Sequence, residues 1–511
     1  MYPGAYDPAR PAVVTADGTR TLTYGQLEER SLRLADHLRA AGLRRGDHLA
    51  LLCDNDPRAL EVYWAAMRSG LYLTAVNHHL RAEEAAYIVR DCGARVLIVA
   101  GSLSELGETV RELAGGPPLV LGLDGGTYEK ALEGASAVPP DRQPLGTDML
   151  YSSGTTGRPK GVEPQLPEGD VRDRPTTYTV VFRTMYGFGE DTVYLCPAPI
   201  YHAAPLRFCG VVIALGGTVV LMESFDAEAA LAAVERHRAT HSQWVPTMFV
   251  RMLKLPAEVR GRYDVSSMKV AIHAAAPCPV EVKRRMMEWW GPVLYEYYSS
   301  TEGNGITFIS PEEWLRKPGS VGRDGYLGTL RICDEEGRVL PPGETGTVYF
   351  ERDEPSFRYH GDEARTREAR HPEHANWSTT GDIGHVDDDG YLFLTDRKAF
   401  LIISGGVNVY PQEAEDVLVM HPAVADVAVV GVPDAEMGEA VKAVVQVEPG
   451  IEPGPELERE LIGFVRDRLA HYKAPRSVDF TASLPRTPTG KLAKSRLRDA
   501  YRADGSRARA R

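Results

Sequence analysis

The chain has 511 residues, a formal net charge of −13 and 43% hydrophobic residues, and at roughly 100–200 residues per domain this length predicts at least two compact domains. A short disordered or disulfide-stapled protein is therefore excluded. Charged residues make up 25% of the chain with both signs mixed, so we expect no nucleic-acid partner, which would need a basic face.

The cysteines and the apolar segments indicate the cellular compartment of the protein. The six cysteines are scattered, with no C-x-x-C pair and no histidine cluster at zinc spacing, so we expect reduced, mostly buried thiols. The N-terminus lacks a basic stretch followed by an apolar one, so no signal peptide is indicated. The longest apolar run, 209–222, contains glycine and falls short of the ~18 residues of a membrane span. We therefore expect a cytoplasmic protein without a membrane span, of open oligomeric state.

The first half of the chain alternates between helical and strand patterns. Residues 22–43 place apolar side chains at helical spacing after Thr23, a residue type that caps helices. Further along, the pattern predicts a strand over 48–55, a helix over 59–70, a helix over 82–91, a strand over 94–100, a strand over 216–222 and a helix over 227–238. Such alternation is typical of a parallel sheet with helices on its faces.

The second half of the chain changes texture twice. Residues 318–349 read as short strands separated by Gly and Pro, which predicts a small β subdomain. A second unit near the C-terminus combines a helix over 412–420 with strands over 425–432 and 440–447. The predicted fold class is therefore α/β: a large N-terminal domain, 1–396, of parallel or mixed sheets with flanking helices and the β subdomain, followed by a small α+β domain, 397–511.

The strongest local signal is the loop YSSGTTGRPKG at 151–161, which follows a predicted strand. Glycines let backbone N–H groups approach phosphate oxygens, hydroxyls add donors, and Lys160 supplies a mobile positive charge. The loop is not a Walker sequence, because its lysine does not directly follow a glycine. On composition alone a flexible surface loop is the alternative. The candidate nucleotide-contacting residues are Ser152, Ser153, Gly154, Thr155, Thr156, Gly157 and Lys160.

Four more motifs follow in order: YSSTEG at 298–303, TGD at 380–382, DRK at 396–398 before IISGGVNVYPQEAE, and PTGK at 488–491. With the glycine-rich loop, and over about residues 22–498, the chain resembles the adenylate-forming superfamily of acyl- and aryl-CoA synthetases, peptide-synthetase adenylation domains and firefly-type luciferases. The resemblance implies activation of a carboxylic acid by ATP as an acyl-adenylate with release of pyrophosphate. Transfer to coenzyme A with release of AMP would follow. ATP, Mg²⁺ and coenzyme A are the implied cofactor and co-substrates.

The resemblance also implies a role for each motif residue. Attack of a carboxylate on the α-phosphate brings two anions together, so positive charge is needed there. Lys491 would bridge carboxylate, ribose and α-phosphate, and Thr301 would contact the α-phosphate. Glu302 and Thr156 would hold the metal. Around the nucleoside the resemblance places Asp382 and Arg397 at the ribose, and Ala275, Ala276, Pro277 and Tyr298 at the adenine.

The acid pocket is less sharply defined. His202 matches a family position near the carboxylate, and for each aromatic candidate a place in the core is the alternative. The candidate walls are Tyr201, Phe208, Trp244, Tyr297 and Ser299. Such walls suit an aromatic, small unsaturated or medium-chain acid. Position 299 is Ser where many members have Gly, which predicts a small or flat acid.

Two half-reactions imply a mobile C-terminal domain. Its rotation would bring Lys491 in for adenylation and Gly405–Gly406 in on the coenzyme A side for thioester formation. Ala399 is the predicted pivot, where family members more usually carry a charged residue. After Val162 the sequence EPQLPEGDVRDRP also replaces the usual basic, His-containing helix start.

These departures leave other acceptors open. A carrier protein in trans could replace coenzyme A, or the enzyme could activate nitrite to modify an aryl amine. A luciferase-like oxidation and a catalytically dead adenylate-binding protein are more remote alternatives. Lys491, Glu302, Asp382 and Lys160 are all present, which favours an active enzyme.

Overall fold

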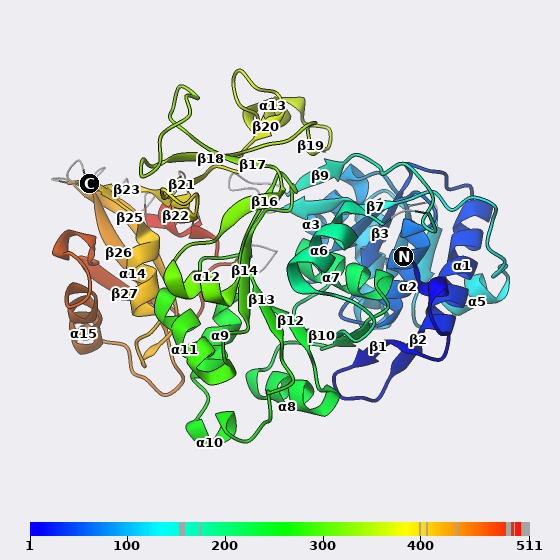
Figure 1. The fold of residues 1–511 in the computed structure, drawn as a ribbon, viewed down its shortest axis with the longest axis horizontal. Helices are drawn as coiled ribbons and strands as arrows, with labels where there is room; N and C mark the ends of the chain where they lie inside the picture. Colours follow the sequence, from blue (N-terminus) through cyan, green and yellow to red (C-terminus); the bar gives the residue numbers. More distant parts are fainter. Residues whose placement is uncertain are drawn as a thin grey trace.

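The computed structural model describes residues 1–117, 119–152, 159–173, 175–397, 400–404, 407–434, 437–486, 492–494 and 496–501, and at 396, 397 and 408 it describes the backbone alone. In this part of the chain the strands form five sheets with helices packed against them (Figure 1). The predicted α/β class is confirmed, with a large N-terminal sheet region and a smaller C-terminal unit.

The first sheet is parallel throughout, in the order β6-β5-β3-β4-β7. Helix α1 begins as predicted, because the Thr23 hydroxyl accepts from the Gln26 amide and the Gln26 side chain accepts from the Thr23 amide, closing both ends of a capping box. The elements are β3 (His48–Leu52), β4 (Tyr72–Val76), β5 (Ala94–Val99), β6 (Leu119–Gly122), β7 (Thr147–Asp148), α1 (Tyr24–Ala40), α2 (Arg58–Met67), α3 (Ala82–Asp91), α4 (Ser104–Leu113) and α5 (Thr127–Glu133).

The second sheet has nine strands in the order β16-β15-β14-β13-β12-β10-β11-β1-β2. Its centre, from β14 to β1, is parallel, and β15, β16 and β2 are antiparallel edges. The strands are β1 (Pro11–Thr15), β2 (Thr21–Thr23), β10 (Val193–Cys196), β11 (Thr218–Leu221), β12 (His241–Trp244), β13 (Val270–His273), β14 (Leu294–Tyr298), β15 (Ile306–Ile309) and β16 (Arg323–Leu327). The helices are α6 (Thr177–Tyr186), α7 (Ala203–Ala214), α8 (Ala227–His237), α9 (Pro246–Leu253), α10 (Ala257–Arg260), α11 (Val280–Trp290) and α12 (Pro311–Arg316).

One buried amide joins the carboxyl ends of these two sheets. The predicted strand over 48–55 ends earlier, at Leu52, and Asn55 turns back toward the second sheet. Its Nδ2 donates to the carbonyls of Ala198 and Met222, and its Oδ1 accepts from the Ile200 amide. The loop before α7 is thereby fixed against the first sheet.

The predicted β subdomain, 318–349, supplies β17 (Thr329–Cys333) and β18 (Gly346–Glu351) to one of two small antiparallel sheets. That sheet also contains β20 (Trp377–Ser378), β21 (Asp382–Val386) and β22 (Leu392–Arg397). The other contains β8 (Leu150–Ser152), β9 (Lys160–Pro164) and β19 (Phe357–Tyr359), which α13 (Glu363–Glu368) follows. In the sequence, the glycine-rich loop connects β8 and β9 of this three-stranded sheet.

The C-terminal unit, orange to red at the left of Figure 1, is a five-stranded mixed sheet with its own core. Its elements are β23 (Ile402–Ser404), β24 (Val407–Val409), β25 (Val424–Asp434), β26 (Gly438–Val447), β27 (Ser477–Phe480), α14 (Pro411–Leu418) and α15 (Pro455–Arg466). Lys254, after α9, reaches across to it and pairs with Glu448 at 2.6 Å.

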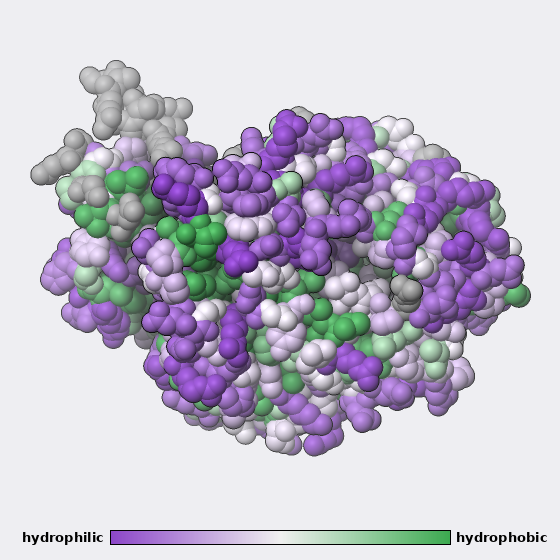
Figure 2. Space-filling view, turned by 45° about the horizontal axis from the view of Figure 1, so that its top comes forward, coloured by the Kyte–Doolittle hydropathy of each residue, from purple (hydrophilic) through white to green (hydrophobic). Residues whose placement is uncertain are grey.

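Two further expectations concern cysteines and membranes. All six cysteines are free thiols, and all but Cys278 are buried, as predicted. No helix within the described ranges is long and apolar enough to cross a membrane. The face shown in Figure 2 is mainly hydrophilic, with smaller apolar patches.

Candidate functional site

Several predicted nucleotide residues meet at the carboxyl end of β14. Tyr298, the last residue of that strand, donates its hydroxyl to Oδ2 of Asp382 at 2.7 Å. The Thr380 hydroxyl donates to the same oxygen at 2.7 Å. Asp382 opens β21 and is the register partner of Arg397 on β22, whose side chain lies outside the described residues. A ring and a carboxylate are thus held together, the pairing that a nucleoside needs at its base and ribose.

The neighbouring strand supplies a close-fitting backbone turn. β13 ends at His273, and Ala275 follows with φ +75°, the left-handed region that residues with a side chain rarely adopt. Ala276 and Pro277 continue the turn toward α11. This loop has the small side chains expected where a flat base approaches the backbone, and it lies at the same end of the sheet as Tyr298 because β13 and β14 are parallel.

A second set of predicted residues meets at Glu302, where phosphate and metal contacts are predicted. The Tyr359 hydroxyl donates to Oε1 of Glu302 at 2.9 Å, and Nζ of Lys160 lies 5.0 Å from the centre of the same ring. Burial lowers the pKa of the Lys160 ammonium, and Arg365 adds to that shift. Tyr359 was not predicted from the sequence, since a lone aromatic in a short strand carries no distinctive signal.

Other predicted residues of this region fall outside the described ranges. Ser152 ends β8, but the loop beyond it does not belong to the described part. The residues concerned are Ser153, Gly154, Thr155, Thr156, Gly157, Ala399, Gly405, Gly406 and Lys491. Their roles stay predictions.

The side chains present suit ATP and Mg²⁺. Within the described ranges no cluster of three or more His, Cys, Asp or Glu could hold a metal ion, and Glu302 is a carboxylate close to Lys160. Mg²⁺ is typically held by one or two carboxylates together with substrate phosphates, so this donor set fits an ion that arrives with the nucleotide.

The predicted acid-pocket residues separate into two groups. Tyr201 packs edge-on against His78 and next to His202. Tyr297 accepts a hydrogen bond from Nε2 of Gln243 at 2.9 Å, and the Ser299 hydroxyl donates to the Gly305 carbonyl at 2.7 Å. These residues lie at the carboxyl ends of the strands, and none of the four predicted residues Tyr201, His202, Tyr297 and Ser299 lines the cavity described below.

Phe208 and Trp244 are core residues in this structure, the alternative given for each aromatic. Phe208 is fully buried and stacks on Phe182 at 4.4 Å. Trp244 is 1% exposed, packs edge-on against Trp290, and donates its indole N–H to Ser242. Full enclosure by other side chains leaves neither ring a face for a ligand.

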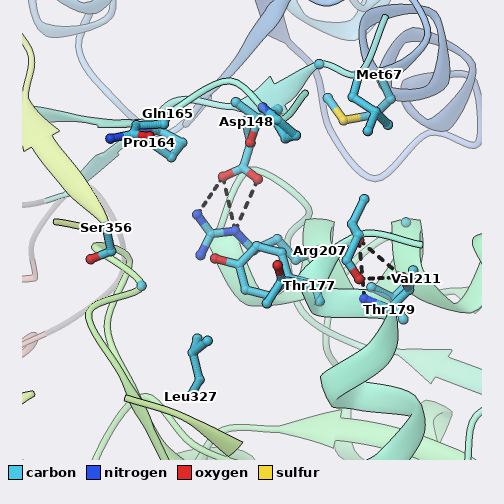
Figure 3. Close-up of a pocket in the computed structure, with 18 of the residues that line it drawn as sticks. Met67, Asp148, Pro164, Gln165, Thr177, Thr179, Arg207, Val211, Leu327 and Ser356 are labelled. Carbon is cyan, nitrogen blue, oxygen red and sulfur yellow. Dashed lines mark hydrogen bonds and ion pairs between the residues drawn. The ribbon is translucent and has the colours of Figure 1, made fainter. Parts of the chain in front are cut away.

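A cavity of about 640 Å³ has Thr301 and Glu302 among its lining residues, and Figure 3 labels several others, including Asp148 and Arg207. Its lining comes from α2, α6, α7, β7, β9, β16, the turn at 301–303 and the segments after β9 and β18. The apolar lining residues include Trp64, Met67, Val162, Val211 and Leu327, and the polar or charged ones include Asp148, Gln165, Thr177, Tyr178, Arg207, Glu302, Arg352, Asp353, Glu354 and Ser356. Its size is that of a small-molecule site.

Two of the lining residues, Arg207 and Asp148, form an ion pair. Nη2 of Arg207 lies 2.7 Å from Oδ2 of Asp148, and Nε contacts both carboxylate oxygens at 3.1 Å. Burial acts to lower the pKa of Arg207, but Asp148 outweighs it and the pKa is raised. The sequence analysis missed this pair, although an arginine within the otherwise apolar helix α7 is a signal that could have been used.

Comparison with known proteins identifies the family. Residues 4–357 match the AMP-binding enzyme family, and residues 413–491 match the family of AMP-binding enzyme C-terminal domains. The chain belongs to the AMP-binding enzyme family. The resemblance drawn from the five motifs is confirmed.

Three similar proteins illustrate the range of this family. A feruloyl-CoA synthase of Amycolatopsis sp is 36% identical over 494 residues, which cover 95% of each chain. The fatty acid–[acyl-carrier-protein] ligase ScoC of Streptomyces coeruleorubidus is 32% identical over 517 residues, 98% of this chain and 95% of that one. Among solved structures, ATP-bound MatB from Rhodopseudomonas palustris superposes with a TM-score of 0.81 at 30% identity, over 97% of this chain and 96% of that chain.

Proposed function

We propose that this protein activates a carboxylic acid with ATP and passes the acyl group to coenzyme A. In the first step a carboxylate oxygen forms a bond to the α-phosphorus of ATP and pyrophosphate leaves. In the second step the sulfur of coenzyme A forms a bond to the acyl carbon, AMP leaves and the thiol proton is lost. The acid is aromatic, small unsaturated or medium-chain.

One observation carries this proposal. The segment from Tyr298 to Glu302 connects two groups of side chains. At one end Tyr298 donates a hydrogen bond to Asp382, the predicted ribose contact. At the other end Glu302 accepts a hydrogen bond from Tyr359, whose ring lies beside Lys160, the predicted phosphate contact. A nucleotide laid along this segment would have its base and ribose at Tyr298 and its phosphates at Glu302 and Lys160. Only residues 299–301 separate the two ends in the sequence, so the α-phosphate would lie at Thr301.

The remaining roles follow from charge. Two anions must approach each other, so cationic groups that are already in place lower the barrier. Lys160 supplies one charge and we assign Lys491 the other, nearest the reacting carboxylate. Mg²⁺ would neutralise phosphate charge when bound. We divide the chain into domains 1–396 and 397–511, with Ala399 as pivot and Gly405–Gly406 facing coenzyme A in the second step.

The acceptor has a second candidate. A carrier protein in trans is favoured by one observation, the similarity to ScoC over nearly the whole chain. The first step and its residues would be the same, and only the source of the thiol would differ.

Mass spectrometry of products tests both candidates. The full-length protein is supplied with ATP, Mg²⁺ and a panel of aromatic and aliphatic acids, with coenzyme A, a phosphopantetheinylated carrier protein, or nitrite with an aryl amine as acceptor. Acyl-CoA supports the first candidate. Pyrophosphate and AMP with acyl-carrier product alone support the second. Product only in the nitrite arm, or no acid-dependent pyrophosphate at all, contradicts the proposal.

A further inference from the structure

Two arginines clamp the segment that carries the predicted phosphate contacts. Nη2 of Arg207 donates to the Thr301 carbonyl at 3.3 Å, and Nη1 of Arg352 donates to the Gly303 carbonyl at 3.2 Å. Both side chains line the 640 Å³ cavity. The arginines therefore hold the Thr301–Gly303 turn from its cavity side.

Both guanidinium groups keep donors for a ligand. Within the described ranges, Nη1 of Arg207 and Nε and Nη2 of Arg352 make no hydrogen bond, and none of these three atoms is fully buried. The Tyr178 hydroxyl lies near the same turn, 3.1 Å from where a side chain on Gly303 would begin. Three polar groups thus converge around one turn.

The two arginines differ in whether a carboxylate neutralises their charge. Arg207 has Asp148 against it, whereas no carboxylate pairs with Arg352 among the described residues. Of the acidic residues that follow or precede Arg352 along the chain, Glu351 pairs with Arg331. Asp353 and Glu354 line the cavity and are exposed, so water screens them. Burial lowers the pKa of Arg352, because its charge is only partly solvated.

An entirely apolar guest fits this cavity poorly. It would displace the water that hydrates the guanidinium and hydroxyl donors and would offer no acceptor in its place. Buried donors left without an acceptor cost binding free energy. A guest with an acceptor oxygen would pair with them, and two guanidinium groups suit a carboxylate especially well. The cavity lining also includes Trp64, Met67 and Val211, which can accommodate an apolar body.

We propose that this cavity receives the body of the acid substrate, and that Arg352 and Arg207 select acids carrying a second acceptor oxygen besides the carboxylate that is activated. The inference rests on the proposed function. It narrows the substrate class to acids with a hydroxyl, carbonyl or second carboxylate group on an otherwise apolar frame.

Matched acid pairs test the selection. Initial rates of pyrophosphate release are measured for hexanoate against adipate and for cinnamate against para-hydroxycinnamate. We expect kcat/KM to favour the oxygenated member of at least one pair by about tenfold or more, because sites built to hydrogen-bond a group reject analogues that lack it. Equal rates or a preference for the plain member in both pairs overturns the inference.

Variants assign the preference to residues. Arg352→Gln is expected to bring the ratio close to one, because kcat/KM for the oxygenated acid should fall more than kcat/KM for the plain acid. Arg207→Met combined with Asp148→Leu removes the buried pair together, so no charge is stranded, and we expect it to lower the same ratio. The control is Arg262→Gln, which breaks an exposed pair with Glu228 and should leave both rates unchanged.

The readouts separate this inference from the proposed function. Absence of pyrophosphate release with every acid contradicts the proposed function itself. If Arg352→Gln instead raises the KM for ATP or weakens inhibition by pyrophosphate while the acid ratio is unchanged, these donors serve the phosphates and the inference is wrong.

Discussion

A buried ion pair beneath the predicted adenine loop gives the sharpest test of the structure. Nζ of Lys283 on α11 lies 2.7 Å from Oε2 of Glu296 on β14, and the Lys283 side chain is fully buried. The ammonium also lies 4.8 Å from the centre of the Trp314 ring. His273 sits 3.4 Å from the same carboxylate oxygen. Lys283→Met would leave Glu296 enclosed and without its cation.

The expected cost follows from that enclosure. Removing one partner of a buried pair typically destabilises by about 3–5 kcal/mol, a large part of the roughly 5–15 kcal/mol that stabilises a folded domain. Lys283→Met with Glu296→Leu removes both charges, so we expect it to recover most of the loss. The two substitutions should therefore be strongly non-additive.

The pH dependence of the single variant has a definite sign. Burial raises the pKa of Glu296 even beside Lys283, and loss of the lysine raises it further. A carboxyl whose pKa is higher in the folded than in the unfolded protein binds its proton more tightly in the folded state. The free energy of unfolding is therefore greatest below the unfolded pKa and falls as pH rises. We expect Lys283→Met to be more destabilising at pH 8 than at pH 5.

Urea unfolding at the two pH values measures these effects, compared at equal m. The control Arg262→Gln breaks an exposed pair and should cost below about 1 kcal/mol. A cost for Lys283→Met as small as that of the control, or costs that simply add in the double variant, would refute the reasoning.

Three further predictions use other parts of the chain. Burial lowers the pKa of His241 to about 4, so we expect stability to fall as pH drops below the unfolded value of about 6.5, by about 2 kcal/mol at pH 5; His241→Gln should flatten that part of a pH–stability curve, and an unchanged slope would contradict it. Ala399→Pro should spare acid-dependent pyrophosphate release and block thioester formation, whereas equal loss of both steps would place the pivot elsewhere. Ser299→Gly should broaden the chain lengths accepted in an acid panel, and an unchanged profile would count against a steric role for Ser299.

Local patterns predicted the elements well where one face of a helix or strand is buried. The helix predicted over 82–91 is α3, Ala82–Asp91, because its apolar residues recur at helical spacing and glycine follows it. Thr23 caps α1 as expected. In both cases the determining contacts lie within a few residues along the chain, so the sequence contains them.

The cavity could not be predicted in the same way. Arg207 and Asp148 lie 59 positions apart, and Arg352 reaches Gly303 from another sheet. Their meeting depends on how α6, α7 and the β subdomain pack, which no periodicity encodes. The family motifs identified Glu302 and Asp382, yet Tyr359, which joins Glu302 to Lys160, lies in no motif used here.

The alternation of one strand connects the two main tests. Along β14, Glu296 and Tyr298 point to one face, where they meet Lys283 and Asp382. Tyr295 and Tyr297 point to the other, where their rings contact Tyr186 of α6 and Phe208 of α7, the helices that line the cavity. Because successive side chains of a strand face opposite sides, β14 would separate the predicted nucleotide contacts from the walls of the proposed acid cavity. Lys283→Met should therefore alter nucleotide affinity before acid preference, and Arg352→Gln the reverse.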